Sequence, residues 1–180
     1  MSMYRIMHRI HRGARGQRGF TLLLAALISS IVLALGASIY ELASKEIQLS
    51  AIGRDSQFAF YAADTAAECA LYWDARTDIH PDTFATSSAS SPAASVDCDQ
   101  QTAAVTVQQP AQTTAATSTF EVDLFSDVKG GPYCADVTIA KWYDGSAERT
   151  TVSANGYSVS CTALGTPSIP ALQRSVELKY

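Results

Sequence analysis

The chain has 180 residues, and its charges are strongly segregated along the sequence. Residues 1–19 carry five arginines and no acid, whereas the remaining residues hold eight lysines and arginines against seventeen acids. Such an acidic body repels phosphates, so no nucleic-acid partner is expected. The length is sufficient for one domain with a core of its own.

An uncharged, mostly apolar segment, Phe20–Tyr40, follows the basic leader at 1–19. As a helix it would be roughly 31 Å long, about the thickness of a bilayer's hydrocarbon core. The leader arginines should stay in the cytoplasm, which places the rest of the chain outside. The sequence therefore predicts a single-pass protein of the cytoplasmic membrane with its C-terminal domain outside.

Three interpretations of the apolar segment are open. A secretory signal would be shorter and would end in a small-residue exit, for which Ala34-Leu35-Gly36 before Ala37 is a candidate. A plain membrane anchor would need no cleavage. A cut just before the segment would instead leave it as the mature N-terminus.

The helix is expected to continue beyond the apolar segment. From Glu41 to Trp73 there is no proline and the only glycine is Gly53. Apolar residues recur there every three or four positions, which predicts an amphipathic helix. The stripe comprises Leu42, Leu49, Ile52, Ala59, Ala63, Ala66 and Ala70. We expect one helix from Phe20 to about Tyr72, within a helical region 20–73 that spans the membrane at about 20–40.

Residues 74–180 are expected to form the outward domain. It starts with an exit loop, Asp74 to Pro81. Residues 85–119 are mostly Ala, Ser, Thr and Gln, and only Asp97 and Asp99 are charged. A flexible surface loop and a strand at 103–108 are both open interpretations of this stretch.

The last third of the chain reads as β-structure. Alternating apolar residues predict strands at 119–125, 134–143, 148–160 and 174–180, with a hairpin turn at Asp144-Gly145. Four strands joined by short polar turns favour an antiparallel sheet. The amphipathic helix half, from Glu41 to Tyr72, would cover one face, so the predicted fold class is α+β. Its alanines would allow a close approach: Ala59, Ala62, Ala63, Ala66, Ala67 and Ala70.

Four cysteines lie on the outward side, where disulfides are favoured over thiols: Cys69, Cys98, Cys134 and Cys161. Three connectivities are possible. A zinc site that includes His80 lacks the paired-cysteine spacing that such sites use, and no metal is expected.

No catalytic motif occurs, so neither enzyme activity nor a cofactor is expected. Asp64 and Glu68 stand four apart on the helix, where a solvated pair is the simplest interpretation. The aromatic residues Trp73, Trp142 and Tyr143 are open to two interpretations, as core or as exposed contact residues. Aromatic residues at strand ends are more often in the core, so no binding site is predicted there.

The stretch RGFTLLLAALISSIVLALGASIYEL, from Arg18 to Leu42, resembles the type IV pilins. The resemblance implies cleavage by prepilin peptidase between Gly19 and Phe20, followed by N-methylation of Phe20. It also implies that the apolar helix is retained and assembles with other pilin subunits, while the sheet domain faces outward.

Leu24 stands at the fifth mature position, where most pilins have glutamate, and the first acid after Gly19 is Glu41. In this respect the chain resembles minor pilins of the PilX type and the tip pseudopilins of type II secretion, as does the helix end QFAFYAADTAAECALYW at 57–73. The resemblance implies a minor subunit of a pilus or secretion filament, at its tip or in its initiation, found finally in a pilus or at the cell surface.

The pairing of the cysteines is also suggested by the resemblance, because pilin-like domains often close their C-terminal region with a disulfide. It implies Cys134–Cys161 as that bridge and leaves Cys69–Cys98 to tie the 85–119 stretch to the helix. A membrane-anchored surface protein that never enters a filament is the alternative function. A secreted binding domain or enzyme carried on a signal peptide is a further one.

Overall fold

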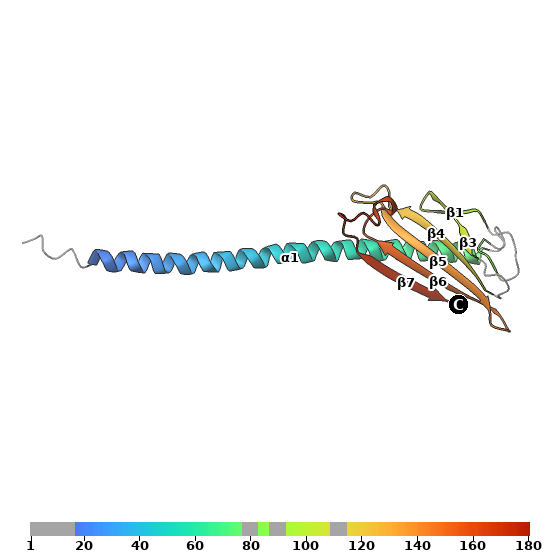
Figure 1. The fold of residues 1–180 in the computed structure, drawn as a ribbon, viewed down its shortest axis with the longest axis horizontal. Helices are drawn as coiled ribbons and strands as arrows, with labels where there is room; N and C mark the ends of the chain where they lie inside the picture. Colours follow the sequence, from blue (N-terminus) through green and yellow to red (C-terminus); the bar gives the residue numbers. More distant parts are fainter. Residues whose placement is uncertain (1–16, 77–82, 87–92, 109–114) are drawn as a thin grey trace, which may run out of the picture. The chain divides into compact units, whose positions relative to one another are not determined.

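The computed structural model describes residues 17–76, 83–86, 93–108 and 115–180 (Figure 1). In the described part of the chain, the helix α1 (Gln17–Ala75) precedes seven strands. The strands are β1 (Ser95–Cys98), β2 (Gln101–Ala104), β3 (Thr106–Gln108), β4 (Ala115–Leu124), β5 (Tyr133–Tyr143), β6 (Glu148–Tyr157) and β7 (Gln173–Lys179), with a short 3₁₀ helix at Cys161–Ala163 before β7. The predicted α+β class is confirmed: a long N-terminal helix packs against an antiparallel sheet.

The chain divides into two compact units, and the boundary between Ser50 and Ala51 falls within α1. The helix itself is unbroken, as its sequence predicts, and it is slightly longer than expected at both ends. Only the part from Ala51 onward belongs to the unit that contains the strands.

Five strands form the main sheet in the order β3-β4-β5-β6-β7, and every neighbouring pair is antiparallel. The four predicted strands correspond to β4, β5, β6 and β7. The hairpin prediction is also confirmed, because β5 and β6 pair up to Tyr143 and Glu148, on either side of Asp144-Gly145. The expected 148–160 strand ends earlier, at Tyr157.

The Ala/Ser/Thr-rich stretch is not a plain loop where the structure describes it. Strands β1 and β2 form a separate two-stranded hairpin, and β3 adds a fifth strand to the main sheet. The single strand considered at 103–108 is divided between β2 and β3 at Val105. Residues 77–82, 87–92 and 109–114 lie outside the described part, and so does most of the expected exit loop.

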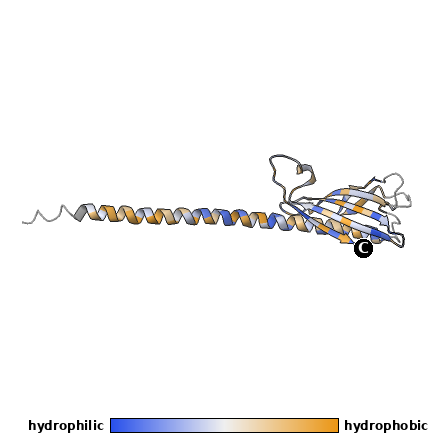
Figure 2. Ribbon diagram, turned by 60° about the horizontal axis from the view of Figure 1, so that its bottom comes forward, coloured by the Kyte–Doolittle hydropathy of each residue, from blue (hydrophilic) through white to orange (hydrophobic). Residues whose placement is uncertain are grey.

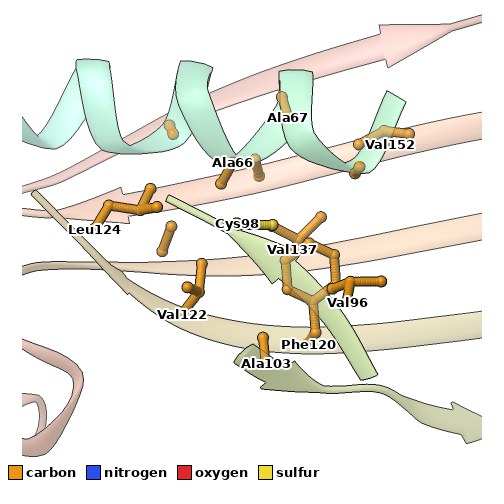
Figure 3. Close-up of a cluster of buried hydrophobic side chains, with 14 of the residues drawn as sticks. Ala66, Ala67, Val96, Cys98, Ala103, Phe120, Val122, Leu124, Val137 and Val152 are labelled. Carbon is orange, nitrogen blue, oxygen red and sulfur yellow. The ribbon is translucent and has the colours of Figure 1, made fainter. Parts of the chain in front are cut away.

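The core lies between the sheet and the alanine face of α1 (Figure 3). From the sheet it receives alternate residues of three strands, for example Phe120, Val137 and Val152. The β1–β2 hairpin adds Val96 and Ala103 to the same cluster. All six alanines that were expected to approach the sheet are buried: Ala59, Ala62, Ala63, Ala66, Ala67 and Ala70.

The helix begins to cover the sheet later than the sequence pattern suggests. The first members of the predicted stripe, Leu42, Leu49 and Ile52, are exposed, and burial starts near Ala59. The reason is the place along α1 at which the sheet begins. Arg174, at the start of β7, donates from Nε to Ser56 Oγ at 2.8 Å, so the edge strand of the sheet reaches α1 only from that turn onward.

Gly156 in β6 is the point where the backbones of helix and sheet come closest. A Cβ atom at this position would lie 2.0 Å from the carbonyl oxygen of Ala59 and 2.4 Å from the nitrogen of Ala63. Both are backbone atoms, which a rotamer change cannot move. Only glycine therefore fits here without displacing the helix.

We predict that Gly156→Ala destabilises the β domain by about 1–3 kcal/mol, because the added methyl group overpacks a backbone contact. Gly53→Ala is the matched control, since a Cβ there meets nothing within 4 Å. In a helix that substitution should be neutral or stabilising by up to about 1 kcal/mol. Urea unfolding of the full chain in detergent, followed by tryptophan fluorescence, compares the two. Equal stability of Gly156→Ala and the unchanged chain would contradict the packing described above.

Candidate functional site

The apolar part of α1 is the most prominent surface feature of the chain. Its large hydrophobic side chains are exposed throughout, and Figure 2 shows their apolar colour giving way to polar colour toward the middle of α1. Among the described residues, α1 is the one helix long and apolar enough to cross a membrane. This feature is compatible with single-pass membrane anchoring.

The three serine hydroxyls within this segment are satisfied inside the helix. The hydroxyls of Ser29, Ser30 and Ser38 donate to the carbonyl oxygens of Ala25, Leu27 and Ala34, at distances of 2.7, 2.8 and 3.0 Å. Because hydrocarbon offers no hydrogen-bond partners, internal bonds of this kind are what a lipid-facing helix requires.

The expected cleavage site, Gly19 and Phe20, lies in the first turn of α1, and both residues are exposed. Leu24 follows Phe20 by four positions, so the two share one face of the helix, where Leu24 is 46% exposed. The segment from Phe20 to Tyr40 contains no charged side chain. Leader residues 1–16 lie outside the described part of the chain.

The structure contains two disulfides, with the pairing that the resemblance implied. Cys69 of α1 is bonded to Cys98 at the end of β1, which fastens the β1–β2 hairpin to the helix. Cys134 of β5 is bonded to Cys161 of the 3₁₀ helix. The Cys161 amide also donates to Asp123 Oδ1 at 2.8 Å, so the turn is held from two sides.

The disulfides also bear on metal binding. Glu121 lies close to the sulfurs of Cys134 and Cys161, the only such group among the described residues. Both sulfurs are committed to the disulfide, and metal ligation requires thiolates. His80, the other candidate ligand, lies outside the described residues.

A buried ion pair joins the last turn of α1 to the sheet. Lys141 Nζ of β5 lies 2.6 Å from Asp74 Oδ1, and their side chains are 9% and 7% exposed. Glu148 Oε1 lies 3.2 Å from the same ammonium group. The Tyr180 hydroxyl donates to Asp74 Oδ2 at 2.8 Å. Burial, together with this bond to Asp74, raises the pKa of Tyr180 far above its usual value.

Sequence reasoning missed this cluster, although the alternation of β5 contains the signal. Val137 and Ile139 point inward, so Lys141, two residues further along, must point the same way. A lysine at an inward position needs an acid partner, and Asp74 at the helix end supplies it.

The other residues singled out from the sequence, Asp64, Glu68 and Trp73, show no arrangement that indicates catalysis or ligand binding. Asp64 is half-buried and Glu68 is exposed, and no ion pair or hydrogen bond joins either to the described part of the chain. Trp73 packs against the core as expected, and its Nε1 donates to the Asp97 carbonyl at 3.0 Å.

Of the two interpretations, core or exposed contact, the favoured core position is wrong for the two aromatic residues at the end of β5. Trp142 is 38% exposed and Tyr143 is 49% exposed. Trp142 points to the face of the sheet opposite the helix, because it alternates with the inward Lys141. Tyr143 lies beside the hairpin turn, past the last buried residue of the strand.

Comparison with protein-family models, curated proteins and solved structures finds no match to this chain. The pilin-like interpretation therefore depends on the residues and the geometry described above. The expected lack of enzyme activity stays a prediction.

We predict that Lys141→Met destabilises the domain by about 3–5 kcal/mol, because it leaves the Asp74 carboxylate buried without its cation. The combined variant Asp74→Leu with Lys141→Met should recover much of that loss, since no buried charge is left unpaired and the Glu148 side chain, 40% exposed, keeps its contact with solvent. Lys179→Met is the matched control: its pair with Glu177 is exposed, and exposed pairs contribute less than about 1 kcal/mol. The measurement is urea unfolding at fixed pH and protein concentration. A double variant as unstable as the sum of the two single variants would argue against the buried pair.

Proposed function

We propose that this protein is a minor pilin-like or pseudopilin subunit of a type IV pilus or a type II secretion filament. Prepilin peptidase would remove the basic leader after Gly19, and the apolar helix would then enter the filament. The observation that carries the proposal is the abrupt step from arginines to an exposed apolar helix at Gly19-Phe20.

The continuity of α1 supports retention of the apolar segment. The helix passes from Phe20 into the alanine face that packs on the sheet without a break. A signal-peptide cut before Ala37 would fall in the middle of this helix, whereas a cut at Gly19 falls in its first turn. The geometry therefore favours the apolar segment as a working part of the mature protein.

The expected orientation follows from charge and from sulfur chemistry. Arginines in the leader favour its retention in the cytoplasm. The two disulfides belong to the β domain and require an oxidising compartment. Both features support a cytoplasmic-membrane precursor with the β domain outside, and a later location in a pilus or at the cell surface.

Leu24 supports a place at the tip or in initiation. A carboxylate in this apolar segment would be costly unless a neighbour's charge, such as a mature N-terminal amine, paired with it. A subunit with no other subunit ahead of it in the filament has no such neighbour. A leucine at this position is the side chain that such a subunit tolerates best.

We predict that the mature protein begins at Phe20 and carries a methylated amine. Intact-mass and N-terminal peptide mass spectrometry of membrane-extracted protein measure this directly. Replacement of Gly19 by a bulky residue should leave uncut precursor, while Gly36→Ala, within the same helix, should be processed normally. An N-terminus at Met1 would instead favour an anchored surface protein that is not assembled, and one at Ala37 would favour a secreted domain.

We also predict that Leu24→Glu lowers, or leaves unchanged, the incorporation of this protein into filaments. At the tip the new carboxylate gains no partner, and its insertion costs up to roughly 2.5–3.5 kcal/mol, with the lower costs near the interface. The measurement is the amount of protein in sheared filaments at matched membrane levels, with Leu24→Gln as the uncharged control. A clear rise for Leu24→Glu alone would place the subunit within the shaft.

A further inference from the structure

A cavity of about 390 Å³ lies in the β domain, where α1, the loop between β4 and β5 and the end of β6 meet. Its volume is within the range of small-molecule sites. Neither the two disulfides nor the proposed filament role involves it. The lining residues are Arg54, Asp55 and Phe58 of α1, Lys129 and Gly130 of the loop, Tyr133 of β5, and Ser158.

The wall of this cavity contains a buried hydroxyl group, that of Tyr133. The residue is 5% exposed, and its ring stacks on Phe58 with the ring centroids 4.8 Å apart. A Cβ atom added to Gly130 would lie 3.2 Å from the hydroxyl oxygen, so the hydroxyl lies beside the part of the wall that Gly130 forms. No hydrogen bond joins it to the described part of the chain. Buried tyrosine hydroxyls usually have a partner, which indicates that this one binds a group from outside the chain.

The loop beside this hydroxyl presents further donors without acceptors. The amides of Lys129 and Gly130 bond to nothing among the described residues, whereas the next amide, that of Gly131, donates to the Val128 carbonyl at 2.9 Å. The Lys129 ammonium group forms no ion pair with the described residues either. Successive free N–H groups in a turn form the kind of concavity that binds anions.

The charges around the cavity favour a ligand with a single negative charge. Arg54 and Lys129 supply two positive charges and Asp55 supplies one negative charge, so the lining is positive by one. Asp55 Oδ1 lies 3.5 Å from Arg54 Nη2, and this one contact leaves most of the guanidinium donors available to a ligand. A dianion would be repelled by Asp55 more strongly than a monoanion would be.

We propose that this cavity binds a sugar acid, which is a carboxylate carried on a hydroxylated ring. The inference does not depend on the proposed function. The carboxylate would accept hydrogen bonds from the Tyr133 hydroxyl and the Gly130 amide and would pair with Lys129. The sugar ring would fill the remaining volume, where Phe58 offers apolar contact and Ser158 offers a hydroxyl. A bare inorganic anion would leave most of that volume to water.

The test is ligand-observed NMR of the full chain in detergent, at low salt and near neutral pH, with glucuronate as the probe. A typical ligand efficiency gives an expected Kd of about 1 mM for a ligand of this size. Glucose has the ring without the charge, and inorganic phosphate has the charge without the ring. Each should bind at least about tenfold more weakly than glucuronate, because each lacks one half of the recognition.

Tyr133→Phe is the most specific variant, because it removes only the hydroxyl and keeps the ring on Phe58. Glucuronate binding should weaken about tenfold, as expected for the loss of a hydrogen bond to a charged group. The stability of the free chain in urea should not fall, since the hydroxyl has no partner to lose. Lys129→Gln should weaken binding roughly three- to tenfold. Lys179→Gln, on β7, removes a lysine that is not part of the lining and should leave binding unchanged.

An absence of saturable glucuronate binding up to about 20 mM would mean that the cavity holds only solvent, and it would overturn the proposal. Phosphate or glucose that binds as tightly as glucuronate would overturn it as well, because the ligand would then not need both charge and ring. Equal binding by Tyr133→Phe and the unchanged chain would remove the assigned role of the hydroxyl. A clear loss of stability in Tyr133→Phe would show that the hydroxyl has a structural partner and would likewise reject the site.

Discussion

The backbone contact at Gly156 is the constraint on which the rest of the β domain depends. With a Cβ excluded there, α1 lies so close to β6 that only alanines fit along its buried face, from Ala59 to Ala70. Alanine buries little apolar area per residue, and close packing must supply the remaining stabilisation through dispersion. A larger residue on α1 or on β6 would push the helix away from the sheet. Its packing against β4, β5 and β6 would then weaken together, because one face of the helix covers all three strands.

A helix that packs through small side chains buries little apolar area, so it needs further interactions to hold its C-terminal part on the sheet. The structure provides two, one covalent and one electrostatic. The Cys69–Cys98 disulfide is covalent and ties α1 to the β1–β2 hairpin. The Asp74–Lys141 pair is electrostatic and ties the last helical turn to β5. An acid near a helix C-terminus is unfavourable by itself, since that end of the helix dipole is negative. Lys141 and the Tyr180 hydroxyl offset this cost, and they fix where the last turn sits on the sheet.

Much of this architecture is readable from the sequence because it depends on local patterns. The alternation of Phe120, Val122 and Leu124 predicts β4, and the absence of proline after Glu41 predicts an unbroken helix. The β1–β2 hairpin was ambiguous because the stretch mixes Ala and Gln, which favour helix, with Thr, which favours strand. Its conformation depends on the Cys69–Cys98 disulfide and on the burial of Val96, neither of which is a local pattern. The exposure of Leu42 was unpredictable for a similar reason: the helix pattern continues, but the place where the sheet begins is set by strand pairing.

The apolar segment Phe20–Tyr40 poses a different physical problem, because the β domain has its own core and does not need it. Burial of those side chains must come from lipid or from other chains. An uncharged helix with internally bonded serines is equally suited to both environments. A bundle of such helices is as apolar as lipid, and the serine hydroxyls need no water because they already have partners in the helix. In the proposed filament, transfer from bilayer to bundle would therefore cost little. A glutamate in place of Leu24 would change this, because its charge would make the transfer depend on finding a partner, and a subunit that leads the filament has none ahead of it.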